Sequence, residues 1–146
     1  MSKAFTKEDD ALPERSVRRR STSGLPPGAV NYMTADGARR LRAEIPAAAP
    51  ERAAHLRQIL ASITVVEPPG DNPDGAIFGA TVTVRDASGG EQRHRIVGVD
   101  EVDFEPGFVS WTSPNGRALL GTAPGHRVAL TLAGESREFT VVRIEY

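Results

Sequence analysis

The sequence predicts an α+β fold: a short antiparallel helical hairpin followed by a β-rich unit that holds one short helix. Apolar residues recur at helical spacing on both sides of a break at Pro46 to Pro50, whereas alternating β-branched residues and glycine-containing turns dominate after about residue 65. With 146 residues and 39% hydrophobic content, the chain can bury a modest core. We expect three regions: a disordered tail at 1–31, the hairpin at 32–66 and the β-rich domain at 67–146.

Composition argues against several classes of function. The formal net charge of −1 gives no bulk attraction to nucleic acid or to an anionic membrane. The chain has no cysteine and three scattered histidines, so we expect no disulfide, no metal site and no cofactor. It also lacks a signal-peptide-like run and any stretch of about 18 apolar residues. We therefore expect a cytoplasmic protein with no membrane partner and no small-molecule substrate.

The tail is expected to be disordered because charge, Ser, Pro and Gly dominate it. It holds an acidic cluster at Glu8-Asp9-Asp10, a basic cluster at Arg18-Arg19-Arg20 and the pair Pro26-Pro27. Such a segment buries too little apolar surface to offset the entropy lost on ordering. The arginine run is short and lies near acids, so solvation is a simpler expectation than nucleic-acid binding.

The hairpin is predicted from caps and apolar stripes. Thr34 is a good N-cap, and Asp36 in the first turn suits the helix dipole. Pro50 with Glu51 opens the second helix. The apolar stripes of the two helices are Ala38, Leu41 and Ile45, and Ala53, Leu56, Ile59 or Leu60, and Ile63. Arms of about 11 residues are too short to be stable alone, so the hairpin must pack against the rest of the chain.

The β-rich domain follows a turn-rich linker at Pro68 to Gly75. Its first hairpin turns at Ser88-Gly89-Gly90, and its short helix starts after Ser113 with Pro at the first helical position. The expected strands are Ala80 to Arg85, Arg93 to Val99, Phe108 to Trp111, Val128 to Leu132 and Phe139 to Ile144, with the helix at Pro114 to Leu120.

Two stretches of this domain resemble the C-terminal domain of the Gre family of transcript cleavage factors. They are Arg95-Ile96-Val97-Gly98-Val99-Asp100-Glu101-Val102-Asp103 and Val109-Ser110-Trp111-Thr112-Ser113-Pro114-Asn115-Gly116-Arg117-Ala118-Leu119-Leu120-Gly121. The ending Phe139 to Tyr146 fits as well. Met1 to Glu8 and Pro26 to Thr34 are similar to the leader of B-type members in particular.

The resemblance implies an FKBP-like fold for the β-rich domain, a curved antiparallel sheet around one short helix. It also implies RNA polymerase as the partner. In the family, a long coiled coil enters the polymerase secondary channel, and an acidic pair at its tip helps to hold a magnesium ion for hydrolysis of backtracked RNA.

The part of the chain that departs from the family is the coil. It is cut to Ala35 to Ala61, and the turn Pro46-Ala47-Ala48-Ala49-Pro50 contains no carboxylate. Glu44 and Glu51 flank this turn, but Arg42 and Arg52 lie close enough in sequence to neutralise them. We therefore expect that the chain is not an enzyme and has no catalytic residue.

The binding half of the family pattern is present. The resemblance places Asp100, Glu101, Ser113 and Pro114 at the positions of the polymerase-docking loops. An exposed acidic loop beside a helix N-terminus can pair with basic groups of a partner. The plainer alternative is that Asp100-Glu101 is a turn and Ser113-Pro114 a helix cap.

These expectations lead to a transcription regulator that docks at the rim of the secondary channel without stimulating cleavage. Any contact with nucleic acid is expected to be weak or indirect, through that complex. Two alternatives stay open: a peptidyl-prolyl isomerase-like protein of the same fold, and a folded but inactive Gre remnant. The isomerase needs an apolar pocket walled by aromatic rings, and the chain has 5 Phe, 2 Tyr and 1 Trp in all.

Overall fold

A computed structural model describes residues 25–71 and 73–146, so most of the predicted tail lies outside the described residues. Asn31, which closes that predicted tail, is buried and begins the first described strand. The helices and strands are β2 (Asn31–Thr34), α2 (Ala35–Glu44), a 3-10 turn (Ile45–Ala47), α3 (Pro50–Ser62), β3 (Ile63–Val66), β4 (Thr81–Arg85), β5 (Glu91–Val97), β6 (Phe108–Ser110), α4 (Pro114–Leu119), β7 (Arg127–Leu132) and β8 (Glu135–Glu145).

The N-terminal unit joins two helices to a two-stranded parallel sheet. Thr34 caps α2 as predicted, because its Oγ1 accepts a hydrogen bond of 3.0 Å from the backbone N–H of Gly37. The predicted assignment of Ile63 to the second helix is wrong: α3 ends at Ser62, and Ile63 starts β3, which pairs with β2. The pairing of residues about 32 positions apart ties the two ends of the helical segment together.

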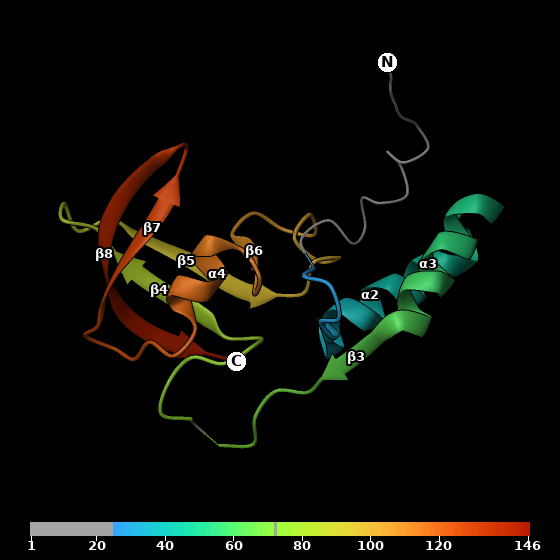
Figure 1. Cartoon of the computed structure of the whole chain (residues 1–146), viewed down its shortest axis with the longest axis horizontal. Helices are drawn as coiled ribbons and strands as arrows, with labels where there is room; N and C mark the ends of the chain where they lie inside the picture. The colour runs from blue at the N-terminus through green and yellow to red at the C-terminus, as the bar shows by residue number, and fades with distance from the viewer. Residues whose placement is uncertain (1–24, 72) are drawn as a thin grey trace, which may run out of the picture.

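The C-terminal unit is a five-stranded sheet with the order β6-β5-β4-β8-β7. All neighbouring strands are antiparallel except β5 and β6, which are parallel. Figure 1 shows that the sheet curls strongly, with α4 beside it and with α2 and α3 at the other end of the molecule. The β4–β8 register shifts between Thr83 and Val84, and such a bulge increases local twist.

Each unit has its own apolar cluster. The sheet cluster contains only residues from Ala76 onward, and its largest buried side chains are Phe139, Ile96, Leu119 and Leu130. The smaller helical cluster contains Met33, Ala38, Leu41, Leu56 and Ile59, with Phe104 from the C-terminal unit packed against it. No described helix is long and apolar enough to cross a membrane.

One side chain of α4 covers an edge of the sheet. The Asn115 amide donates to the carbonyl oxygen of Thr131 at 2.9 Å, and its Oδ1 accepts from the Thr131 N–H at 2.8 Å. Thr131 lies on β7, the last strand of the sheet, so Asn115 makes the two bonds that another strand would make there.

Candidate functional site

The loop after β5 holds two of the predicted site residues, and they have different environments. Glu101 is fully buried. Its Oε2 accepts from the N–H groups of Thr34 at 2.9 Å and Gly98 at 2.8 Å, and its Oε1 accepts from the Thr34 hydroxyl. The expectation of an exposed acidic loop is therefore wrong for Glu101, because all three of these bonds are made inside the protein.

Burial also changes the acidity of Glu101. Loss of solvent raises the pKa of this carboxyl, and the hydrogen bonds from Thr34 and Gly98 oppose that rise. Thr34 was predicted only as a helix cap. Its second role depends on a contact between residues 67 positions apart, which sequence spacing does not reveal.

Asp100 is the half-buried neighbour of Glu101. Its Oδ2 accepts from the side-chain amide of Asn31 at 3.1 Å. Burial raises the pKa of Asp100, while the Asn31 bond and the nearby His55 of α3 oppose that rise. The carboxyl thus lies where the N-terminal unit meets the sheet, and part of it remains open to solvent.

Ser113 and Pro114 form the start of α4, as predicted. The Ser113 Oγ accepts from the Gly116 N–H at 3.0 Å and donates to the Ser110 carbonyl oxygen at 2.7 Å. Pro114 occupies the first turn and is exposed. A Cβ at Gly116 would lie 1.9 Å from the Ser110 oxygen, so only glycine lets α4 approach β6 this closely.

The two loops leave the sheet at the same edge. Strands β5 and β6 are parallel, with Val97 beside Ser110, and the Trp111 N–H donates to the Val97 oxygen at 2.9 Å. Asp100 and Ser113 each follow three residues after this aligned pair. Parallel strands therefore bring Asp100, Ser113 and Pro114 to one end of the sheet. We call these three residues the docking surface, after the role predicted for them from the sequence.

The connection between α2 and α3 carries no carboxylate. Glu44, at the end of α2, accepts from the Arg52 Nε at 2.9 Å, and this bond lowers the pKa of Glu44. Across residues 25–71 and 73–146, no three His, Cys, Asp or Glu side chains gather as metal ligands would. The residues at this connection thus do not fit the magnesium ion that the family resemblance implies.

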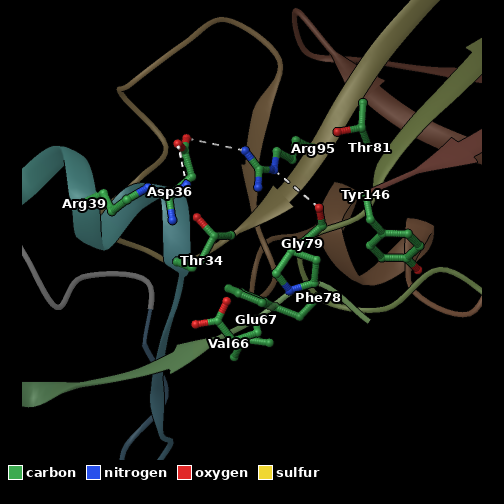
Figure 2. A pocket seen from close by; sticks show the side chains of 12 residues that line it. Thr34, Asp36, Arg39, Val66, Glu67, Phe78, Gly79, Thr81, Arg95 and Tyr146 are labelled. Atoms are coloured by element: carbon green, nitrogen blue, oxygen red, sulfur yellow. Dashed lines mark hydrogen bonds and ion pairs between the residues drawn. The ribbon is translucent and has the colours of Figure 1, made fainter. Parts of the chain in front are cut away.

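A cavity of about 480 Å³ lies between α2, the end of β3 and the sheet. Figure 2 shows Asp36 and Arg39 on one side, Arg95 and Thr81 on another, and Tyr146 at the far end. The Arg95 Nε donates to the Gly79 oxygen at 3.3 Å, and its Nη1 lies 3.8 Å from Asp36. The lining is mixed: two aromatic residues, Phe78 and Tyr146, share it with the charged residues Asp36, Arg39, Glu67 and Arg95. An isomerase pocket is walled mainly by apolar and aromatic side chains, and this cavity matches that description only in part.

The sequence of residues 71–146 matches the family model described as the C-terminal domain of the transcription elongation factors GreA and GreB. The chain belongs to the GreA/GreB family. Both loops of the docking surface lie inside the matched segment, whereas β2, α2, α3 and β3 precede it.

Curated relatives of this Gre-family chain include two proteins named transcription elongation factor GreA. The protein from Trichlorobacter lovleyi is 38% identical over 96 residues, which cover 65% of this chain and 61% of the relative. The protein from Alkalilimnicola ehrlichii is 42% identical over 89 residues, which cover 60% and 56%. The chain thus spans about 60% of the length of these relatives.

A solved GreA/GreB elongation factor from Nitrosomonas europaea shares 26% identity with the chain. The alignment covers 81% of this chain and 99% of the other, with a TM-score of 0.47.

The expectation that the chain is not an enzyme is contradicted by these relatives. They are GreA elongation factors at 38% and 42% identity, and the family resemblance links this class to hydrolysis of backtracked RNA. The prediction relied on the shortened coil and on the missing acidic tip.

Proposed function

We propose that this Gre-family chain binds RNA polymerase at the rim of the secondary channel through its docking surface. The observation that supports this most is the common edge of the parallel β5–β6 pair, where Asp100, Ser113 and Pro114 lie within the segment that matches the family. A partly open carboxylate beside a capped helix start offers one charged and several polar contacts to a basic partner surface.

Within this proposal, Glu101 does not contact polymerase. A side chain with no exposed surface, whose oxygens already accept three hydrogen bonds, has nothing left to offer a partner. Asp100 is the acidic residue of the docking surface, whereas Glu101 binds Thr34 and so fixes the loop that contains Asp100.

We further propose that the chain stimulates transcript cleavage more weakly than a GreA with a full-length coil. The described connection from Ile45 to Ala49 has no carboxylate, and Glu44 is paired with Arg52. Helix α3, the longer arm, has 13 residues and so spans about 20 Å at 1.5 Å per residue. Both reach and charge are therefore smaller than in a long coil with an acidic tip, so we expect weaker stimulation.

Three finer assignments belong to the same proposal. The C-terminal unit is of the FKBP-like type, supported by its curled, mostly antiparallel sheet with one short helix. The two helices are the remainder of the family coiled coil, which leaves a helical region at 32–66 and a docking domain at 67–146. The leader residues favour a B-type member, and a polymerase partner implies a cytoplasmic location.

The test is competition. A backtracked polymerase complex is cleaved with a limiting amount of an intact GreA while this chain is titrated in. We expect the cleavage rate to fall as the chain occupies the shared site, and the chain alone to give slower cleavage than the same amount of GreA.

Charge reversal identifies the surface. D100R should weaken the competition at least about tenfold, the size expected when one charged contact is replaced by repulsion. D103R is the matched control, because Asp103 is an exposed acid of the following turn. Equal competition by the wild type and D100R would show that docking uses another surface. No competition by the wild type at all would indicate a folded remnant.

A further inference from the structure

The contact between the N-terminal unit and the sheet is centred on one buried carboxylate. Glu101 comes from the loop after β5, whereas Thr34 ends β2 and caps α2. Two of the three bonds to Glu101 come from Thr34, through its N–H and its hydroxyl, and the third comes from Gly98 of the same loop. The Glu101 side chain thus connects the start of α2 to the loop that contains Asp100.

Glycines on both sides make this connection close. A Cβ at Gly37 would lie 2.1 Å from the Glu101 Oε1, and a Cβ at Gly98 would lie 2.0 Å from the Tyr32 carbonyl oxygen. Real Cβ atoms do not approach other atoms so closely, so neither position accepts a side chain without movement of the contact. The close approach restricts how α2 can sit against the loop.

Other contacts across the same junction are more open to solvent, including the 3.1 Å hydrogen bond from the Asn31 side-chain amide to Asp100. Arg40 of α2 bonds to the half-exposed Glu105, and exposed ion pairs of this kind contribute little. The Tyr32 ring packs at 5.9 Å from the Phe78 ring and 5.6 Å from the Trp111 ring, measured between centroids. Rings resist separation of the units but fix their relative angle less strictly than directional hydrogen bonds do.

We infer that Glu101 is a positioning residue that holds α2 and α3 at one fixed angle to the docking surface. Polymerase contact through Asp100, Ser113 and Pro114 then also sets the direction in which the helices point. If the two parts are already held together before binding, the complex does not have to lose further conformational entropy to order them. The polymerase part of this inference depends on the proposed function, whereas the fixed angle does not.

The chemistry of the junction distinguishes between replacements. All three groups that face Glu101 donate a hydrogen bond, so an oxygen acceptor is needed at this position. Glutamine keeps an oxygen of the same reach for the Thr34 and Gly98 N–H groups, while alanine keeps none. E101Q should therefore preserve the angle and E101A should lose it.

The angle can be measured without polymerase. The chain has no cysteine, so two can be introduced for spin labels at the exposed positions Arg57 on α3 and Ser136 on β8. We expect a narrow distribution of label distances in the wild type and in E101Q, and at least about a twofold wider one in E101A. E105A is the matched control, because it removes an exposed carboxylate that also crosses the junction, and its distribution should stay narrow.

An unchanged distribution in E101A would overturn the inference. Far-UV circular dichroism shows whether E101A folds. If it does not, the distribution of label distances is measured in T34A instead, since this variant removes only the hydroxyl donor and the helix cap. Competition with GreA on polymerase separates the two proposals. D100R removes the Asn31 bond but leaves the three bonds of Glu101, so it should lose competition and keep a narrow distribution of label distances. E101A should lose about tenfold in competition together with the narrow distribution, and E101Q should restore both.

Discussion

At the scale of single residues, Gly37, Gly98 and the Glu101 carboxylate determine how the N-terminal unit meets the sheet. Gly98 approaches the backbone of Tyr32, and Glu101 fills the remaining space with its side chain. The sequence predicts a solvent-exposed acidic loop here, but in the folded protein Asp100 is half buried and Glu101 is buried.

Adding a methyl group at Gly98 should destabilise the protein strongly. In G98A the new Cβ meets the Tyr32 carbonyl oxygen, which is backbone and cannot rotate away. We expect a loss of about 3 kcal/mol in the free energy of unfolding, at the upper end for overpacked sites. Urea denaturation measures this loss. G70A is the control, since nothing lies within 4 Å of that Cβ, and it should change stability by less than about 0.5 kcal/mol.

Glu101 should make stability depend on pH. Burial raises its pKa in the folded protein above the ordinary value of 4.5, so the unfolded chain releases this proton first as the pH increases. The contribution of Glu101 to stability is therefore complete below about pH 4.5 and is lost as the pH rises through the folded pKa.

Urea denaturation of the wild type and E101Q between pH 4 and pH 8 checks this sign. Glutamine does not titrate, and the other groups are shared, so the free energy of unfolding of the wild type minus that of E101Q should fall as the pH rises. A difference that grew with pH would mean that the hydrogen bonds from Thr34 and Gly98 outweigh burial.

At the scale of helices and strands, local signals predicted more than long-range ones. The capping residues Thr34 and Ser113 and the turn at Ser88-Gly89-Gly90 were confirmed, because each works within a few residues. The strand pair β2–β3 was missed, since two four-residue strands separated by both helices leave no local pattern. The burial of Glu101 was missed for the same reason: its Thr34 partner is 67 residues away.

Ser113 should stabilise α4 as its N-cap. S113A removes the oxygen that accepts from the Gly116 N–H, and the loss of an N-cap of this kind costs about 1 kcal/mol of stability. Chemical denaturation should show this loss in S113A and only a small one in S113T, which keeps the hydroxyl. The same loss in both variants would assign the effect to packing rather than to the cap.

At the scale of the whole molecule, the two apolar clusters are unequal. Every residue of the sheet cluster comes from position 76 or later, whereas Phe104 of the C-terminal unit packs against the helical cluster. The sheet should be able to fold without the helices, while the helices depend on the sheet.

A fragment of residues 71–146 tests this dependence. We expect a β-type far-UV circular dichroism spectrum and a cooperative urea transition, because the fragment holds the complete sheet cluster. Trp111 fluorescence should shift relative to the full chain, since the Tyr32 ring at 5.6 Å is lost. Fragment 25–70 should show little helix. An unfolded 71–146 fragment would mean that the junction around Glu101 is needed for folding itself.

The pairing of Asn115 with Thr131 has a consequence for how the molecules behave in a crowded solution. An unpaired outer strand offers its backbone to the same strand of a neighbouring copy, and stacks of copies joined in this way become insoluble. A single amide side chain occupies the Thr131 position of β7, so a second molecule cannot pair in register there without first displacing it. In N115A we therefore expect light scattering to appear at lower protein concentration than in the wild type, because the substitution removes a barrier to self-association.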